Sequence, residues 1–368
     1  MRLRKLAIIF FCLFFSPLLE ARPTTIGIFT FKFHLVGHWD PDSVNSGITG
    51  SEEAVIYMSK ELAELGYQVT VYGNPPPDSP HTDADSNPRY VDLSNDDHSH
   101  LDIAISWRMP QKGSSLRKRA DKVYLWPHDL CARKLKDSYV NCFDDVLWIS
   151  SWQRKQWISK TPKFSAFRRI FGNGIEPDQF GPILERKNPH SCVYGSNYAR
   201  GLEQLLDIWP QVKERFPDAS LDIYYGWLNS STLKKETEAK MKKQIVEYHS
   251  LSVTEHGKVG HEELNQAFAQ SSLWTYPCNC DETFCITASR AQASGALPVI
   301  INRAALGETV NGGFSCSKKQ EYLDTLLAAM EYAETIALEE REQLRAFVFE
   351  KYTWKTIAEQ WDDLFQGR

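Results

Sequence analysis

Short apolar runs alternate with amphipathic stretches along most of the chain. The run TIGIFTF at residues 25–31 is compact and apolar, which is typical of a buried parallel strand. Residues 51–66 carry apolar side chains on one face of a predicted helix that begins at Ser51 and closes at Gly66. Residues 67–73 predict the next strand. Strand, helix and strand in this order predict a βαβ unit, and therefore a parallel sheet with helices on its faces.

The same alternation predicts two series of strands and helices. In the first series, strands are predicted at residues 101–107, 122–128 and 145–151, and a helix at 151–160. In the second series, which begins near residue 190, the predicted strands are 191–196, 220–227, 271–277 and 296–302, and the predicted helices are 201–217, interrupted at Pro210, and 233–250.

The join between the series and the end of the chain complete the predicted organisation. Residues 172–190 are rich in glycine and proline and are predicted to form a hinge. Residues 352–365 predict a last helix, whose apolar side chains form one stripe that must pack on something. We therefore expect an α/β chain with two doubly wound, Rossmann-like domains at residues 22–175 and 176–350, and a C-terminal helix at 351–368.

Residues 1–21 have a pattern of their own. Basic residues precede an unbroken apolar run at residues 6–15, and Ala21 offers a small residue for cleavage. This pattern is typical of a secretory signal peptide, with a non-cleaved anchor as the alternative. We expect an exported or secretory protein, or one associated with a membrane through residues 6–19; the alternative places the folded domains on the cytosolic face. NSS at residues 229–231 fits an N-glycosylation acceptor.

Composition limits the classes of function. The chain has 368 residues, 42% of them hydrophobic, and a net charge of −5, which suits a soluble two-domain protein and gives no basic footprint for nucleic acid. Among the eight cysteines, a pair such as Cys131 and Cys142 could oxidise in an exported protein, and CNC at residues 278–280 is expected to be a loop with buried thiols. No C-x-x-C pair is present, which argues against a zinc site.

Four polar features follow the carboxyl ends of predicted strands, where doubly wound sheets bind their ligands. The loop at residues 46–53 carries Gly47 and Gly50, which let the backbone approach a ligand closely, although many turns of this kind carry glycine. His128 and Asp129 follow another strand. The imidazole can hydrogen bond a substrate hydroxyl or move a proton, although an isolated loop histidine is more often structural.

The other two features belong to the second series. Arg200 lies between a strand and the start of a helix, where a guanidinium can clamp a diphosphate or simply lie in solvent. Glu282 precedes a helix whose first backbone N–H groups belong to about residues 284–287. Such a helix start binds phosphate without a metal, and the alternative is an ordinary capped helix.

In their order and spacing, these stretches resemble the family-four glycosyltransferases, which have the GT-B fold. The resemblance covers residues 24–368. It is carried by GITGSEEAVIYMSKELAELGYQVTVYG, LWPHDL, GNGIEPDQF, ARGLEQLLDIWP and DETFCITASRAQASGALPV, with YTWKTIAEQW as a terminal helix that crosses back to the first domain. It implies a nucleotide-sugar donor on the second domain and a glycan, lipid or protein acceptor on the first, with acceptor contacts in loops such as residues 74–100. It also implies transfer with retention, without a metal or another cofactor.

The resemblance also implies roles for individual residues. His128 and Glu282 form the implied catalytic pair, with His128 on the transferred sugar and Glu282 on its hydroxyls. Arg200 neutralises the donor diphosphate in this assignment. The other implied donor-binding residues are Gly47, Gly50, Gly174, Thr283, Phe284, Cys285, Ile286, Thr287 and Arg290.

The chain departs from the family pattern at two positions. Arg290 stands where the family has a second glutamate that accepts hydrogen bonds from the donor ribose, and a guanidinium has no acceptor. Thr49 stands where a second glycine is common, and a Cβ is expected to be costly there. The leading hypothesis is a glycosyltransferase of the hexosyltransferase type. The alternatives are a catalytically impaired GT-B protein that binds a glycan or a nucleotide, and a transferase whose donor carries another phosphate held by Arg290.

Overall fold

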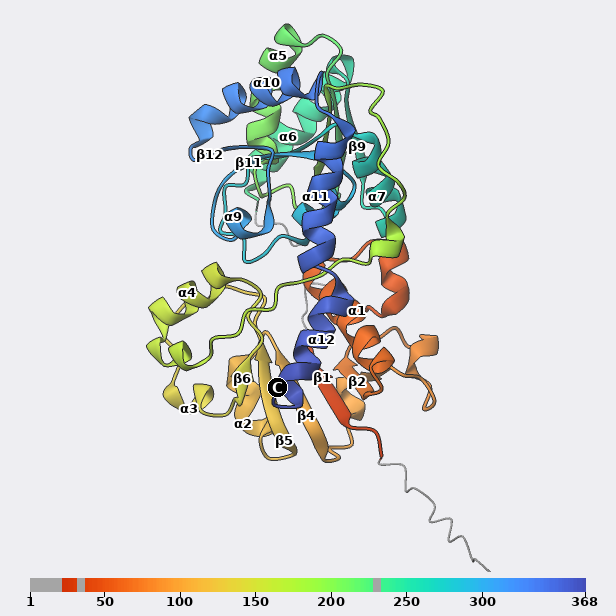
Figure 1. The fold of residues 1–368 in the computed structure, drawn as a ribbon, viewed down its shortest axis with the longest axis vertical. Coiled ribbons are helices and arrows are strands. Elements are labelled where there is room, and N and C mark those ends of the chain that lie inside the picture. Colours follow the sequence, from red (N-terminus) through yellow and green to blue (C-terminus); the bar gives the residue numbers. More distant parts are fainter. Residues whose placement is uncertain (1–21, 32–36, 228–232) are drawn as a thin grey trace, which may run out of the picture.

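Two parallel sheets, one in each half of the chain, form the framework of the molecule (Figure 1). The computed structural model describes residues 22–31, 37–227 and 233–368. The signal-peptide and membrane predictions for residues 1–21 and the glycosylation motif at 229–231 therefore lie outside the described residues. Among the helices that the structure describes, none combines the length and the apolar character needed to span a bilayer.

The first sheet has six parallel strands in the order β3-β2-β1-β4-β5-β6, which is the order of a doubly wound Rossmann sheet. Aliphatic side chains hold its centre, where Ile28 lies opposite Val71 on one side and Ile105 on the other. The strands are β1 (Thr25–Phe29), β2 (Gln68–Gly73), β3 (Arg89–Asp92), β4 (Leu101–Trp107), β5 (Ala120–Trp126) and β6 (Asp145–Val146).

The second sheet repeats this topology. Its order is β12-β11-β10-β7-β8-β9, so that counting from its own first strand, β7, it is again a doubly wound sheet with the same order. The strands are β7 (Ser191–Gly195), β8 (Ser220–Tyr224), β9 (Val253–Gly257), β10 (Leu273–Tyr276), β11 (Leu297–Ile301) and β12 (Phe314–Cys316).

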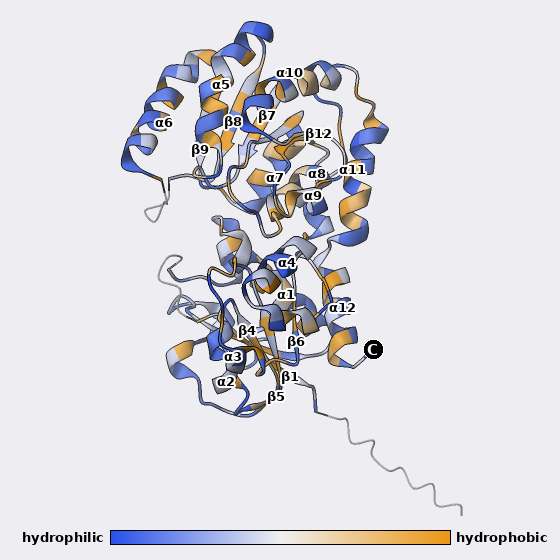
Figure 2. Ribbon diagram, turned by 90° about the vertical axis from the view of Figure 1, so that its left-hand side faces the viewer, coloured by the Kyte–Doolittle hydropathy of each residue, from blue (hydrophilic) through white to orange (hydrophobic). Residues whose placement is uncertain are grey.

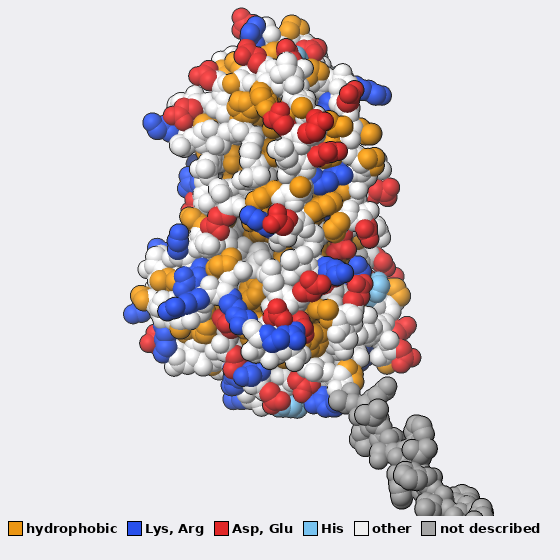
Figure 3. All heavy atoms as spheres, in the orientation of Figure 1, with side chains coloured by type: hydrophobic (Ala, Val, Ile, Leu, Met, Phe, Trp, Pro, Cys, Tyr) orange, Lys and Arg blue, Asp and Glu red, His pale blue; other side chains and the backbone are white. Residues whose placement is uncertain are grey.

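Helices cover the sheets and turn their polar faces outward, as Figure 2 shows clearly for α6. The helices of the first domain are α1 (Gly50–Glu64), α2 (Gly113–Leu116), α3 (Asp137–Val140) and α4 (Ser151–Lys160). Those of the second domain are α5 (Leu202–Arg215), α6 (Lys235–Glu247), α7 (His261–Gln270), α8 (Ile286–Ala293), α9 (Leu306–Thr309) and α10 (Tyr322–Ala333). Two further helices, α11 (Leu338–Lys351) and α12 (Trp354–Phe365), end the chain. Acidic and basic side chains are interspersed over the face seen in Figure 3.

The last helix, α12, returns to the first domain, as the final blue segment of Figure 1 shows. Trp354 and Trp361 are fully buried, and Trp361 packs edge-on against Trp126 with ring centroids 4.7 Å apart. The Tyr67 hydroxyl donates a 2.5 Å hydrogen bond to Asp362. The apolar stripe predicted from the sequence therefore packs on the α1 side of the first sheet, in one core with residues of that domain.

Two predicted elements differ in the structure. Strand β6 ends at Val146 rather than at residue 151, because only its first two residues pair with β5 and Trp148 pairs with Ile170 instead. Pro210 does not interrupt α5, which continues to Arg215. The proline lies on an exposed face, where water can satisfy the carbonyl group that loses its partner.

Candidate functional site

The start of α8 presents free backbone donors at the junction of the two domains. Cys285 precedes the helix with φ of +83°, and the side chain of Phe284 is buried against Tyr352, with ring centroids 5.1 Å apart. Within the described residues, no hydrogen bond satisfies the N–H groups of Ile286 and Thr287. Because these groups carry the positive end of the helix dipole, they can bind an anion.

Arg200 and Glu282, 82 residues apart in the sequence, meet beside this helix start. The Arg200 Nη1 atom lies 2.6 Å from Glu282 Oε1, and the Tyr276 hydroxyl donates to the same oxygen. Burial alone would lower the pKa of Arg200, but the Glu282 carboxylate raises it well above its ordinary value. The guanidinium therefore remains charged, and its side chain is 44% exposed, so it can still reach a phosphate.

A glycine allows this close approach. Gly201 has φ of +110°, and a Cβ there would lie 2.0 Å from the Pro277 carbonyl oxygen. Both features exclude a side chain, so the loop that carries Arg200 can press directly on the loop that leads to Glu282.

His128 belongs to the first domain and lies next to the same loop of the second. The Thr283 hydroxyl donates a 3.1 Å hydrogen bond to the His128 carbonyl oxygen. The imidazole lies between Trp107 and Trp126, and its Nε2 atom has no hydrogen-bond partner among the described residues. Burial, helped by the charge of Arg108, lowers the pKa of His128 well below its ordinary value. The ring is therefore neutral near pH 7, and its Nε2 nitrogen retains an unused hydrogen-bonding capacity within the described residues.

The glycine-bearing loop of the first domain packs directly on the second domain. Gly47 has φ of +87°, and a Cβ there would lie 2.3 Å from the Val259 carbonyl oxygen. A Cβ on Gly50 would be 3.4 Å from the Ile286 side chain, at the start of α8. Thr49 has φ of −80°, which is ordinary extended backbone, and its hydroxyl donates to Glu52. The expected cost of a Cβ at position 49 is therefore absent.

The positions of two predicted donor-binding residues, Gly174 and Phe284, are explained by packing within the protein. A Cβ on Gly174 would lie 2.4 Å from the Trp354 backbone nitrogen, so this glycine permits the close contact between the linker and α12. Phe284 is 2% exposed and belongs to the core of the first domain, so only its backbone is available to a donor.

Arg290 lies at the centre of a buried polar cluster that joins the domains. It is 2% exposed and forms an ion pair with Glu53 of α1. It also donates a 2.8 Å hydrogen bond to Asn265 Oδ1 and lies 3.1 Å from His261 Nδ1, both on α7. Gln179 of the linker accepts from the guanidinium at 3.4 Å. We call these five residues the Arg290 cluster. Because its contacts use the guanidinium, the Arg290 side chain is not free to hold a further phosphate.

The contacts within the Arg290 cluster determine which ring nitrogen of His261 carries the proton. Arg290 carries only donors, so His261 Nδ1 must accept, which leaves the proton on Nε2, 3.5 Å from Glu53. Burial lowers the pKa of His261 to about 4; the Glu53 charge opposes this shift and the Arg290 charge adds to it. The hydrogen bonds and the lowered pKa agree on a neutral ring.

We expect His261 to make the folded protein less stable as the pH falls from 7 to 5. Its pKa is about 4 in the folded state and 6.5 ordinarily, so the unfolded chain takes up the proton first. The stability is complete above pH 6.5 and is lost as the pH falls toward 4. At 1.36 kcal/mol per pKa unit, the loss between pH 7 and pH 5 is about 2 kcal/mol. Urea unfolding of the wild type and of His261→Gln at both pH values measures it, and an equal pH dependence in the two proteins would contradict it.

Several residues at the domain junction were not identified from the sequence. Arg108 is bound by both carboxylate oxygens of Asp129, at 2.7 and 2.5 Å, and lies 3.8 Å from Glu52. Burial raises the pKa of Glu52. Glu308 of the second domain accepts hydrogen bonds from the first two N–H groups of α4, at 2.8 and 2.6 Å. Glu52 and Glu53 lie in the first turn of α1, and nothing in the local sequence pattern shows which residues they contact.

A cavity of about 700 Å³ lies on the first domain, outside this junction of residues. Its lining includes Tyr72, Tyr90 and His100, together with much of the loop at residues 75–100. The family resemblance implies acceptor contacts in loops such as residues 74–100, which overlap this lining.

Two Rossmann-like domains that meet at the carboxyl ends of their strands, with a terminal helix that crosses back, define the GT-B fold. No protein-family model matches the chain, and no curated protein matches it either. Several solved structures match the chain.

Sucrose-phosphate synthase from Thermosynechococcus elongatus matches with a TM-score of 0.70 and 17% identity over 94% of this chain and 98% of that chain. A glycosyltransferase from Rickettsia africae matches with a TM-score of 0.70 and 14% identity over 94% and 99% of the two chains. HepE from Anabaena, solved with UDP and glucose, matches with a TM-score of 0.68 and 12% identity over 94% and 100%. The chain therefore has the GT-B fold, and at these identities the likeness extends to the fold alone.

Proposed function

We propose that this protein is a glycosyltransferase that moves a sugar from a nucleotide-activated donor to an acceptor hydroxyl of a glycan, lipid or protein. One observation carries the proposal: three features lie where the two domains join. They are the N–H groups at the start of α8 and the His128 nitrogen, neither satisfied within the described residues, and the Arg200–Glu282 pair. HepE, which shares the fold, has been solved with UDP and with UDP-glucose. A nucleoside diphosphate sugar is the ligand class that uses all three features.

Each feature has a role in this proposal. The α8 start and Arg200 stabilise the diphosphate as negative charge develops on the leaving group, which is the task of a divalent cation in other enzymes. Glu282 accepts hydrogen bonds from sugar hydroxyls, because a carboxylate is an acceptor only. The neutral His128 ring bonds a further hydroxyl of the transferred sugar. Transfer without a metal and with retention belongs to the same proposal.

We further propose that the chain is a member of family four with an altered ribose contact. In that family the position of Arg290 carries a glutamate, whereas Arg290 here is bound by Glu53 and Asn265. Its side chain supplies no acceptor, so the donor ribose must be held by other groups. In this proposal, the arginine at position 290 changes the affinity for the nucleotide, and the diphosphate and sugar contacts described above are retained.

Thermal-shift titration of the purified protein with UDP, UDP-glucose and other nucleoside diphosphate sugars tests donor binding. We expect at least one donor to raise the melting temperature by several degrees, since a ligand at 100 times its Kd adds about 2.7 kcal/mol of stability. Arg200→Ala should abolish this shift. Arg215→Ala is the matched control, because Arg215 lies in an exposed pair with Glu331 and over the ring of Phe216, away from the proposed site.

A donor-hydrolysis and transfer assay on the donors that bind separates the two functional classes. Turnover supports the transferase. Binding without turnover, under conditions in which product is detected for a known transferase, supports the catalytically impaired binding protein instead. The absence of any shift with every donor would overturn the proposal.

A further inference from the structure

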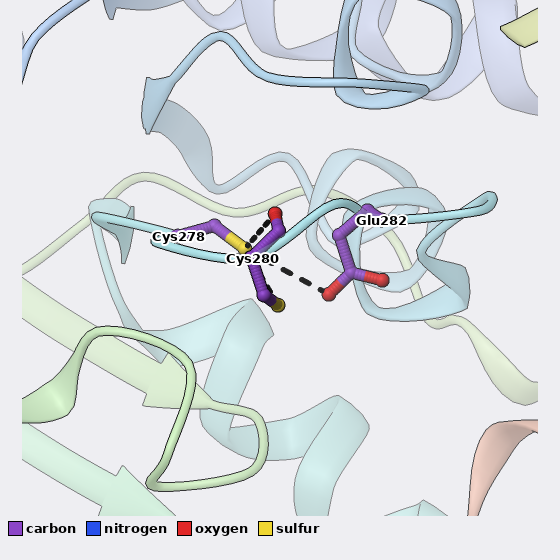
Figure 4. A group of neighbouring side chains, drawn as sticks. All are labelled: Cys278, Cys280 and Glu282. Carbon is purple, nitrogen blue, oxygen red and sulfur yellow. Dashed lines mark hydrogen bonds between the residues drawn. The ribbon is translucent and has the colours of Figure 1, made fainter. Parts of the chain in front are cut away.

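Two thiols lie in contact beside Glu282, in the loop between β10 and α8. The Sγ atoms of Cys278 and Cys280 are 3.5 Å apart, and Cys278 Sγ is 3.9 Å from Glu282 Oε1 (Figure 4). Cys278 is fully buried, whereas Cys280 is partly exposed. The loop predicted to hold buried thiols therefore holds one buried cysteine and one partly exposed cysteine.

The charges around this pair disfavour a metal ion. The two sulfur atoms and a Glu282 oxygen are close enough together to share a cation. However, the Arg200 guanidinium already binds Glu282 at 2.6 Å, and both Arg200 and Arg303 act electrostatically on Cys280. Arg303 is in turn paired with Asp281 at 2.6 Å. Because the Glu282 oxygen is already taken by Arg200, a cation would have to displace a guanidinium to use it, whereas a thiolate is favoured by the two nearby guanidiniums. The arrangement is therefore one for thiol chemistry.

The two thiols are not equivalent in reactivity. The hydrogen bond with Cys278 lowers the pKa of Cys280, and the charges of Arg200 and Arg303 lower it further, although burial and Glu282 oppose them. The same hydrogen bond, together with burial, raises the pKa of Cys278. A partly exposed cysteine with a lowered pKa next to a buried second cysteine is the arrangement of an attacking and a resolving cysteine.

We propose that Cys278 and Cys280 are a reversible redox site that forms a disulfide by exchange with a small disulfide such as glutathione disulfide. The Cys280 thiolate attacks one sulfur of glutathione disulfide, forms a mixed disulfide and releases one glutathione thiolate. The Cys278 sulfur then attacks the Cys280 sulfur and displaces the second glutathione, which takes up the Cys278 proton. In total, the two protein thiols lose two electrons and two protons, and glutathione disulfide becomes two molecules of glutathione.

The disulfide alters the surroundings of Glu282, a consequence that rests on the proposed function. The sulfur atoms must approach from 3.5 Å to about 2.0 Å, so the loop has to tighten. Only Asp281 separates Cys280 from Glu282. Glu282 is 5% exposed and shared between Arg200 and Tyr276, so a shift of its backbone disturbs both contacts. Oxidation is therefore expected to weaken donor binding or turnover.

Mass spectrometry of the full-length protein tests the thiol chemistry without reference to any activity. The protein is equilibrated in glutathione buffers of increasing glutathione disulfide content, and free thiols are then alkylated under denaturing conditions. As the glutathione disulfide content rises, we expect the peptide that contains Cys278 and Cys280 to change from a doubly alkylated form to an unalkylated form. The mass of this unalkylated form should be two hydrogens below that of the reduced, unalkylated peptide. Dithiothreitol should restore both alkylation sites.

Variants distinguish this site from general thiol oxidation. Cys278→Ser should stop at a glutathione adduct on Cys280, because the resolving thiol is absent. Cys142→Ser is the matched control, since Cys142 is a free, partly exposed thiol away from this loop, and it should leave the disulfide unchanged. Full alkylation of Cys278 and Cys280 in every buffer would overturn the proposal. So would a wild type that stops at the mixed disulfide.

The consequence for the donor site is measured separately. If the reduced protein binds a donor, we expect at least a fivefold loss of affinity or turnover in the oxidised form, reversed by dithiothreitol. Unchanged binding and turnover in a fully oxidised sample would refute the link to Glu282. If neither form binds any donor while the disulfide forms, the proposed function fails and the redox site stands on the mass measurement.

Discussion

Replacing Arg290 with methionine lowers the free energy of unfolding by about 3–5 kcal/mol, the usual cost of breaking a buried ion pair from one side. The size of the loss follows from the burial of both partners, since the side chains of Arg290 and Glu53 are 3% and 4% exposed. The variant leaves the Glu53 carboxylate in a closed space without its cation, with the neutral His261 ring 3.5 Å away. Urea unfolding measures the loss as a lower midpoint.

The double variant Arg290→Met and Glu53→Met tests the cause. When both charges are removed together, apolar side chains of similar volume fill the space and most of the lost stability returns. The exposed pair of Arg215 and Glu331 is the control, because breaking it by Arg215→Met should cost less than about 1 kcal/mol. A loss below 1 kcal/mol in Arg290→Met, or a double variant as unstable as the single one, would show that the pair does not join the domains.

The strands and helices that carry a complete local pattern were predictable from the sequence. β4 occupies residues 101–107 as predicted, because its apolar run fills the centre of a sheet that is buried on both faces. α4 occupies residues 151–160 as predicted, and the Ser150 hydroxyl caps it at 3.0 Å. β9, by contrast, was missed. It is an edge strand with the polar sequence VTEHG, and pairing with β8 rather than its own composition makes it a strand.

The site was predictable as far as backbone position fixes it. Arg200 and Glu282 follow neighbouring strands, and the carboxyl ends of parallel strands share one edge, so their contact follows from the topology. The partner of Arg290 was not predictable in this way. Glu53 lies 237 residues away on the other domain, and only the way in which the domains meet selects it. The sequence showed that Arg290 is a basic residue where the family pattern has an acid. The structure shows that the Glu53 carboxylate neutralises it.

His128→Phe should reduce turnover of a donor that the wild type uses by about 100-fold while making the protein slightly more stable. The phenyl ring keeps the packing against Trp107 and Trp126 but removes the nitrogen that would bond the transferred sugar. A loss of this size corresponds to one well-placed catalytic hydrogen bond, about 2.7 kcal/mol. Stability should rise by about 1 kcal/mol, because Nε2 is buried with no hydrogen-bond partner among the described residues and the variant removes the cost of desolvating it.

The control for this variant is His190, a buried histidine with known partners that lies away from the domain junction. His190 bonds Asp218 at 2.9 Å and Glu334 at 3.1 Å, and it lies before β7, at the opposite end of the second sheet from the domain junction. His190→Phe should therefore lose stability and keep its turnover, the reverse of His128→Phe. Measured together, kcat, the Kd of UDP and urea midpoints distinguish a sugar contact from a packing residue. If His128→Phe keeps full turnover, the unpartnered nitrogen has no part in transfer.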